Sequence, residues 1–214
     1  MLARARTAAK NLAEALLPPS LVVWRGGRER RRVALTFDDG PDELTLEYLK
    51  ALEQLDVRAT FFVVGEHCAR RPELVSAIAE RGHELGNHGY THRPFSSLGR
   101  RELLDELTRT QALLPPTTRA RALVRPPYGA VSPTAFYTCA RAGFTTVMWS
   151  LNSGDWKRHD AHAVAGAFQR RAAAPGDIVL LHEGQRWTLD ALPTVVAELK
   201  MADHELVRIS ELLT

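Results

Sequence analysis

The sequence is poor in cysteine and has no long apolar run, and both absences exclude classes of protein. Its two cysteines, Cys68 and Cys139, stand far apart among 214 residues and form no CxxC pair. Neither a disulfide framework nor a cysteine-rich zinc site is therefore indicated, and we expect two free thiols. No window holds eighteen uninterrupted apolar residues, so no transmembrane helix is predicted.

The excess of positive charge is also small. Lys and Arg number 28 and Asp and Glu number 25, which leaves a formal net charge of +3. Nucleic-acid-binding domains carry a stronger basic bias and cluster it on one element, so we expect no nucleic-acid partner. Hydrophobic residues make up 45% and charged residues 25%, which is typical of a globular domain and excludes a disordered chain.

The first residues predict a short helix over 2–17, because apolar residues recur there at steps of three and four. Asn11 and Glu14 interrupt the apolar stretch, and Pro18 ends it. A signal peptide needs an unbroken apolar stretch, so we expect no export signal and a cytoplasmic or membrane-peripheral location. Packing of this helix on the barrel or on a partner chain is favoured over a weak contact with a membrane surface.

A basic run, Arg28 to Arg32, follows this helix. We interpret it as a solvated loop, with a contact to anionic lipid headgroups or to a lipid-diphosphate sugar as the alternative. The predicted organisation is an N-terminal helix and basic segment over 1–32, followed by a catalytic domain over 33–214. No oligomeric state is assigned.

From residue 33 onward, short β-type runs alternate with helical patterns, which predicts an α/β fold with a parallel sheet. The predicted strands are 33–37, 59–64, 83–85, 123–124, 144–149, 177–181 and 205–209. The predicted helices are 44–55, 72–81, 100–114, 132–142, 160–173 and 189–201. No internal repeat or linker divides this region, so we expect one domain.

Polar clusters follow five of these strands. They are Thr36–Pro41, Asn87–His92, Arg125–Gly129, Asn152–Trp156 and Leu180–His182, whose polar residue is His182. The carboxyl ends of parallel strands share one face, and in α/β barrels that face holds the active site. An open doubly wound sheet would gather ligands at one crevice, so convergence from five strands favours a barrel.

The clusters contain the donors for one metal ion. Two adjacent carboxylates, Asp38 and Asp39, cannot both lie ionised and unpaired in an apolar pocket, and a cation removes the conflict. His88 and His92 are four residues apart, a spacing that can aim both rings at one point. One Asp with two His suits zinc with open positions, although a ferrous oxygenase uses the same donors.

The remaining groups favour hydrolysis. A second carboxylate beside the metal, Asp38, can act as general base toward water, and His182 can protonate the leaving group. Arg125 can pair with Asp38, and Asp155 can orient His182. Each motif alone has an ordinary structural explanation, such as a turn or a half-buried histidine, but five in succession at strand ends favour a site.

These motifs resemble those of the polysaccharide deacetylase family, carbohydrate esterase family four, over about 33–199. The family includes chitin and peptidoglycan deacetylases. The resemblance implies a distorted, TIM-like (β/α) barrel of about seven parallel strands. It also implies Asp38 as the catalytic base and Asp39, His88 and His92 as the metal ligands.

The resemblance implies roles for five further residues. Arg125 would tune the base, and the backbone amide of Tyr128 would help to bind the oxyanion. Asp155 would pair with the catalytic acid His182, and Trp156 would form an apolar wall.

The implied reaction is removal of the N-acetyl group from an N-acetylhexosamine unit of a glycan or glycolipid, with release of acetate. The implied cofactor is one divalent ion, zinc first and cobalt or nickel as alternatives. Two other functions stay open: an O-acetyl esterase or deformylase acting on a lipid-linked sugar, and a catalytically inactive glycan-binding member.

The sequence departs from the family pattern at two positions. Gly89 stands where the family usually has Ser or Thr after the first metal-binding His, and Asn152 stands where it usually has Asp. Neither change removes a predicted ligand, base or acid. We expect them to affect the rigidity of the loops and the fit of the substrate more than the chemistry.

Overall fold

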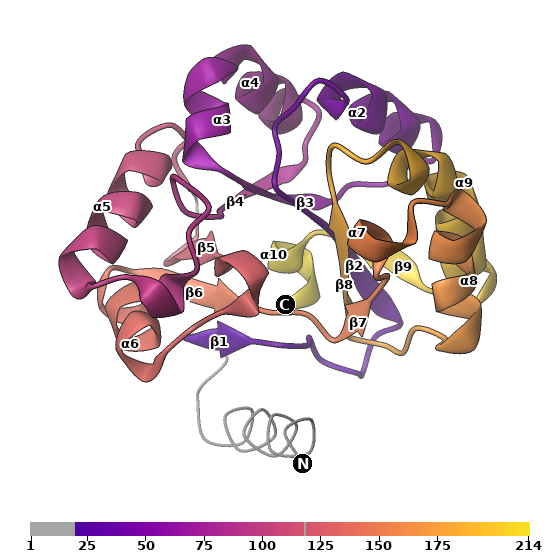
Figure 1. The fold of residues 1–214 in the computed structure, drawn as a ribbon. Helices are drawn as coiled ribbons and strands as arrows, with labels where there is room; N and C mark the ends of the chain where they lie inside the picture. Colours follow the sequence, from indigo (N-terminus) through magenta and orange to yellow (C-terminus); the bar gives the residue numbers. More distant parts are fainter. Residues whose placement is uncertain (1–19, 118) are drawn as a thin grey trace.

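One curled sheet of parallel strands organises the molecule (Figure 1). The computed structural model describes residues 20–117 and 119–214, so the helix predicted over 2–17 lies outside the described residues. The strands are β1 (Val22–Val23), β2 (Arg32–Asp38), β3 (Thr60–Val63), β4 (Glu84–Asn87), β5 (Ala122–Val124), β6 (Phe144–Val147), β7 (Leu151–Asn152), β8 (Ile178–His182) and β9 (Glu205–Val207). Their order is β1-β6-β5-β4-β3-β2-β8-β7, with β9 also paired to β2.

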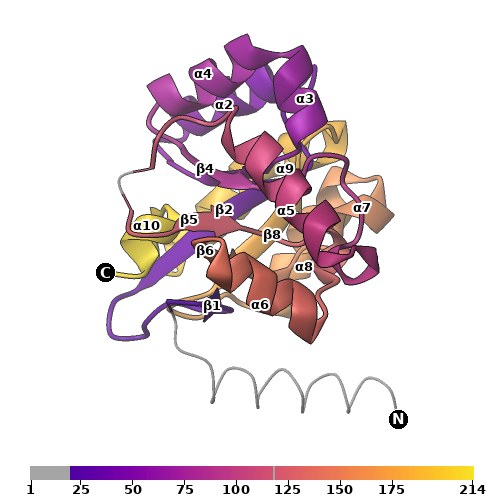
Figure 2. The same ribbon diagram turned by 90° about the vertical axis from the view of Figure 1, so that its left-hand side faces the viewer.

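Helices lie on the outer side of this sheet (Figures 1 and 2). The α-helices are α2 (Thr45–Gln54), α3 (Gly65–Arg70), α4 (Pro72–Glu80), α5 (Arg100–Gln111), α6 (Pro133–Arg141), α7 (Asp155–Arg158), α8 (Ala161–Arg170), α9 (Arg186–Met201) and α10 (Ile209–Leu212), with short 3₁₀ turns at Phe95–Ser97 and Pro127–Gly129. Among the described helices, none is both long and apolar enough to cross a bilayer.

Strand β2 shows why the sheet has two apolar faces. Its side chains alternate, so Leu35 and Phe37 pack with the outer helices, whereas Ala34 belongs to a second cluster with Phe62 of β3. All four side chains are fully buried. A parallel sheet covered on both faces needs such continuous apolar strands, and Thr36 and Asp38 point to the same inner side as Ala34.

Helix α10 covers the end of the barrel opposite to α7 (Figure 2). Ile209 and Leu212 pack into the inner cluster, and the backbone N–H of Ile209 donates to Thr60 Oγ1 at the start of β3. The expectation that Ile209 ends a strand was therefore wrong, because strand β9 stops at Val207 and Ile209 begins a helix. Position 209 needs an apolar side chain whether it lies in a strand or in a helix, so the hydrophobic pattern did not distinguish the two.

The predicted barrel is confirmed, with two strands more than the seven expected. Strands β1 and β7 have only two residues each, too few for a periodic pattern. Val22 and Val23 pair with Thr146 and Val147 of β6. The later part of the predicted N-terminal segment therefore belongs to the sheet rather than preceding it.

The basic run Arg28–Arg32 lies near the beginning of β2. Arg31 pairs with Asp203 at 3.2 Å and Arg32 pairs with Glu205 at 2.8 Å, so part of its charge is used within the chain. Asp38 lies at the other end of β2, about 20 Å away at 3.3 Å per residue. The run therefore faces away from the end of the barrel where the polar clusters gather. Both cysteines are free and buried, as predicted.

We predict that Phe61→Ala lowers the free energy of unfolding by about 3–5 kcal/mol, the usual cost of deleting a buried aromatic side chain. Phe61 is fully buried, and its ring stacks on that of Phe37 at 5.1 Å. Urea denaturation followed by circular dichroism measures this loss. Tyr137→Ala, at a side chain 57% exposed, is the matched control and should change stability by less than about 0.5 kcal/mol.

Candidate active site

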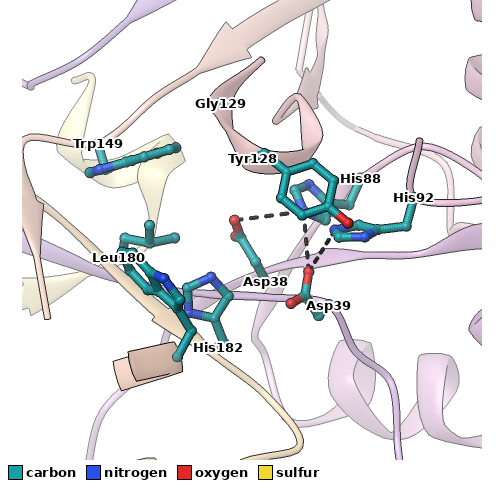
Figure 3. Close-up of a pocket in the computed structure, with 10 residues that line it drawn as sticks. Asp38, Asp39, His88, His92, Tyr128, Gly129, Trp149, Leu180 and His182 are labelled. Atoms are coloured by element: carbon teal, nitrogen blue, oxygen red, sulfur yellow. Dashed lines mark ion pairs between the residues drawn. The ribbon is translucent and has the colours of Figure 1, made fainter. Parts of the chain in front are cut away.

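The predicted clusters converge on one pocket of about 320 Å³ at the carboxyl ends of the strands (Figure 3). Its lining comprises Asp38, Asp39, His88, His92, Tyr128, Gly129, Trp149, Trp156, Leu180 and His182. Seven of the nine residues predicted for the site line it directly. Arg125 and Asp155 are fully buried behind it.

Asp39, His88 and His92 form a compact group. The distances from Asp39 Oδ1 are 3.4 Å to His88 Nε2 and 2.9 Å to His92 Nε2. The three donor atoms lie within 4.8 Å of one another, as expected for ligands of one ion. Burial favours the neutral carboxyl, but the hydrogen bonds from both imidazoles outweigh it and hold the pKa of Asp39 well below its usual range.

The donor set fits a divalent metal. His88 Nδ1 is 2.7 Å from the carbonyl oxygen of Arg125, which leaves Nε2 to face Asp39. This is the usual arrangement of a metal-binding histidine, because the second ring nitrogen sets the tautomer and the ring orientation. Two imidazole nitrogens and one carboxylate oxygen are typical zinc ligands, and two ligands about 2.0–2.1 Å from one tetrahedral ion would lie about 3.3 Å apart.

Asp38 is held by the buried Arg125. The guanidinium Nη1 donates to Asp38 Oδ1 and to Thr36 Oγ1, both at 2.7 Å. The other oxygen of Asp38, Oδ2, is turned toward His88 Nε2 at 3.8 Å. Asp38 therefore has one oxygen occupied by the arginine and one directed into the pocket. Burial lowers the pKa of Arg125, and the charge of Asp38 opposes that shift.

Asp155 holds His182 at two points. Its Oδ1 lies 2.8 Å from His182 Nδ1, and its Oδ2 accepts from the backbone N–H of His182 at 2.7 Å. The hydroxyl of Thr188 donates to the same Oδ2 at 3.0 Å. Burial alone would lower the pKa of His182, but the hydrogen bond and charge of Asp155 outweigh it, so that pKa is raised. The arrangement leaves Nε2 of a protonated imidazole available to the pocket.

Two exposed aromatic side chains flank the pocket. Tyr128 is 70% exposed and its ring lies 4.8 Å from that of His92, whereas Trp156 is 38% exposed and lies 5.3 Å from His182. Tyr128 has a left-handed backbone, with φ 59°, inside a 3₁₀ turn. Trp149 and Leu180 complete the wall beside His182, and no motif had singled them out as site residues.

The structure locates both departures from the family pattern. Gly89 has φ +78°, and a Cβ there would lie 3.1 Å from the ring of Phe95. An L side chain would therefore be strained and crowded in this conformation. The side chain of Asn152 is exposed, and its Oδ1 accepts from the N–H of Gly154 at 2.8 Å. Asn152 therefore shapes the turn before Asp155 and does not line the pocket.

Glu183 is a further buried residue of the site that the motifs did not predict. It lies under the turn after β2, where its Oε1 accepts from Thr45 Oγ1 at 2.5 Å, while its Oε2 is buried without a partner among the described residues. The backbone N–H of Glu183 donates to the carbonyl of Asp38 at 2.9 Å. Burial raises the pKa of Glu183 to about 8. Its position directly after His182 was the only signal in the sequence.

Comparison with known proteins gives one consistent family. A family model described as polysaccharide deacetylase matches residues 25–147. A peptidoglycan-N-acetylglucosamine deacetylase of Bacillus cereus is 34% identical over 208 residues, covering 94% of this chain and 97% of that protein. A chitooligosaccharide deacetylase of Sinorhizobium fredii is 39% identical over 166 residues, covering 76% of each chain.

Solved structures agree with this result. A peptidoglycan N-acetylglucosamine deacetylase in complex with 4-naphthalen-1-yl-N-oxidanyl-benzamide has a TM-score of 0.85 at 30% identity, covering 91% of this chain and 93% of that one. A carbohydrate esterase family four pseudoenzyme from Bacillus anthracis has a TM-score of 0.83 at 29% identity, covering 92% and 70%. The fold therefore occurs in active and inactive proteins, and activity has to be argued from the site residues.

We predict that Glu183→Gln removes a pH-dependent loss of stability. The pKa of Glu183 is about 8 in the folded chain and about 4.3 in an unfolded one. Between these values the unfolded carboxyl ionises and the folded one stays protonated, so stability falls as pH rises toward 8. The unfolding free energy of the variant minus that of the wild type should therefore increase from pH 5 to pH 8. Urea titrations with chelator present measure this difference, and a difference independent of pH would contradict the assignment.

Proposed function

The chain belongs to the polysaccharide deacetylase family, and we propose that its pocket hydrolyses the acetamide of an N-acetylglucosamine unit, with Asp38 as base and His182 as acid. The protein is accordingly a carbohydrate N-deacetylase. The observation that carries the mechanism is the placement of the two groups: Asp38 and His182 are register partners on the neighbouring strands β2 and β8. Both reach one pocket, beside the Asp39, His88 and His92 cluster (Figure 3).

Members of this family depend on a metal, and Asp39, His88 and His92 are the residues that would hold it here. A divalent ion there would polarise the acetyl carbonyl and lower the pKa of a water molecule. We propose zinc, with cobalt or nickel as alternatives, because two imidazoles and one carboxylate suit a borderline ion with open positions.

Asp38 accepts the proton of the attacking water. The Arg125 guanidinium binds Oδ1 at 2.7 Å, so Oδ2 is the oxygen left to take the proton. The same contact fixes the orientation of the carboxylate. We propose that the backbone N–H of Tyr128 contributes to stabilising the oxyanion, because its turn lies over His92 at the edge of the pocket.

His182 supplies the proton that the departing nitrogen needs. Its Nδ1 is bound to Asp155, so the transferable proton is on Nε2, on the pocket side. The pKa of His182 is raised, which favours the protonated ring, and the loss of that proton at higher pH stops the reaction. Trp149, Trp156 and Leu180 form the apolar wall near His182, which we assign to the acetyl methyl group and to exclusion of bulk water.

The substrate that we propose is an N-acetylglucosamine unit of a glycan. Support comes from relatives whose names specify peptidoglycan N-acetylglucosamine and chitooligosaccharides. A glycolipid substrate, contact of the N-terminal segment with a membrane, and a cytoplasmic or membrane-peripheral location stay predictions. Acetate release from chito-oligomers, peptidoglycan fragments and lipid-linked sugars, each tested alone, separates these substrates. Formate release and O-acetylated sugars test the deformylase and esterase alternatives.

An inactive glycan-binding function is disfavoured by the completeness of the site. Asp38 is paired with Arg125, and His182 is paired with Asp155. The three metal donors Asp39, His88 and His92 lie together. An inactive relative on the same fold makes the direct test necessary: metal content and acetate release should both be found with the purified chain. A protein that binds chito-oligomers without releasing acetate would support the inactive alternative.

We predict that Asp38→Asn and His182→Ala each lower kcat by about 10²–10⁴-fold, the usual contribution of a positioned general base or acid. Both variants keep Asp39, His88 and His92, so zinc binding measured by competition with a chromophoric chelator should persist. Rates within a factor of three of the wild type would show that the altered residue does not have the assigned role.

We predict that Asp155→Asn moves the high-pH limb of the kcat/KM profile to lower pH. Asp155 raises the pKa of His182, so a neutral amide lets the imidazole lose its proton at lower pH. The profile on a soluble chito-oligomer measures this shift. Asn152→Asp is the matched control, because that exposed side chain bonds Gly154 and should not move the limb downward. An unchanged limb in Asp155→Asn would contradict the assignment of His182 as the acid.

A further inference from the structure

Helix α5 carries a buried carboxylate that the mechanism does not use. Glu106 is 5% exposed and lies on the buried face of the helix with Leu103, Leu107 and Thr110. Acidic side chains are almost never buried unless they are paired or hydrogen-bonded, because desolvation of a carboxylate is costly. The partners of Glu106 therefore indicate what it does.

Three groups donate hydrogen bonds to this carboxylate, and all of them belong to residues 88–92, which we call the metal loop. Glu106 Oε2 accepts from the backbone N–H of Tyr90 at 2.6 Å and from that of Thr91 at 2.8 Å. Its Oε1 accepts from the hydroxyl of Thr91 at 2.5 Å. Tyr90 and Thr91 are the two residues directly before His92. The carboxylate thus fixes the backbone that delivers the second imidazole.

The metal loop needs such a constraint because of its own backbone. Gly89 and His92 both have left-handed backbones, with φ of 78° and 58°. For His92 this conformation costs on the order of 1 kcal/mol or more and persists only where its surroundings enforce it. Gly89 has no hydroxyl with which to brace the loop, although the family usually has Ser or Thr there.

The two histidines are anchored differently. His88 is buried, and its Nδ1 is bound to the carbonyl of Arg125. Asn87 fixes the same end of the loop, because its Oδ1 accepts from Gly89 N–H and its Nδ2 donates to the carbonyl of Leu107. His92 has a side chain 25% exposed, and its ring touches Asp39 and the exposed Tyr128. Among the described residues, Glu106 is the side chain that binds the two N–H groups directly before His92, while the carbonyl of Tyr90 accepts from the N–H of Glu66 at 2.9 Å.

We propose that Glu106 is a positioning residue for His92: by hydrogen-bonding Tyr90 and Thr91 it holds the imidazole beside Asp39 and thereby sets the affinity of the site for its metal ion. Helix α5 thus serves as the support of the metal loop, and Thr91 with Glu106 does the bracing that Gly89 cannot do. This inference rests on the proposed metal site.

Zinc affinity of the full chain, stripped of metal and titrated against a chromophoric chelator, tests the proposal. Glu106→Ala removes all three hydrogen bonds and should raise the Kd for Zn²⁺ about 10–100-fold, as is usual when support of a metal ligand is lost. Glu106→Gln should restore the Kd to within about threefold of the wild type, because its amide oxygen accepts from both N–H groups and its NH₂ can donate to Thr91 Oγ1.

Leu103→Ala is the matched control for general destabilisation. It deletes a buried side chain from the same face of α5 and removes no hydrogen bond to the metal loop. It should lower the melting temperature of the metal-free chain and leave the Kd for Zn²⁺ unchanged. At saturating Zn²⁺, Glu106→Ala should recover at least a third of the wild-type kcat, because the residue acts through the loop and not on the substrate.

Three results would overturn the proposal: wild-type affinity in Glu106→Ala, failure of Glu106→Gln to restore binding, or an equal loss of affinity in Leu103→Ala. If Glu106→Ala does not fold, Thr91→Val decides instead. That variant loses only the hydroxyl contact and should weaken zinc binding about threefold or more, and an unchanged Kd would refute the proposed role. A wild-type chain that binds no divalent ion would instead refute the metal site itself, which keeps the two failures distinguishable.

Discussion

The buried pair of Arg125 and Asp38 is the interaction on which the rest of the site depends. Arg125 is the largest fully buried side chain of the described residues. It donates to Asp38 and Thr36 of β2, to the carbonyl of Val147 at the end of β6 and to that of Met148, the next residue. The guanidinium also lies over the ring of Phe62 of β3 at 4.1 Å. A desolvated arginine is tolerated only when it is paired and hydrogen-bonded in this way.

Arg125 also connects Asp38 to the group formed by Asp39, His88 and His92. The carbonyl of Arg125 orients the His88 ring, while its guanidinium orients Asp38. A shift of Arg125 would therefore move Asp38 and His88, the proposed base and one proposed metal ligand, together. Leaving either partner of a buried ion pair alone costs about 3–5 kcal/mol. This cost explains how short loops at the ends of strands keep the side chains of the pocket in place.

Around this centre, each reactive side chain has a support from another element. Asp155 holds His182, and Thr188 of α9 holds Asp155. The turn after β2 lies over Glu183, whose carboxylate accepts a hydrogen bond from Thr45 of α2. Because Asp155, Thr188 and Thr45 belong to α7, α9 and α2, the packing of these helices and the geometry of the pocket are linked. The polar side chains of these networks are linked by hydrogen bonds of fixed geometry, which water molecules in an open cleft would not provide.

The sequence by itself determined the alternation of strands and helices and seven of the ten residues that line the pocket. Its signals were the polar clusters after buried strands, the adjacent Asp38 and Asp39, and the spacing of His88 and His92. These are local signals, and the rule that parallel strands end on one face converts them into a site. Only the tertiary structure decided the positions of β1 and β7, the helix at Ile209 and the roles of Glu106 and Glu183. Two-residue strands have no period, and a buried glutamate on a helix differs from a solvated one only in what packs against it, which local sequence does not specify.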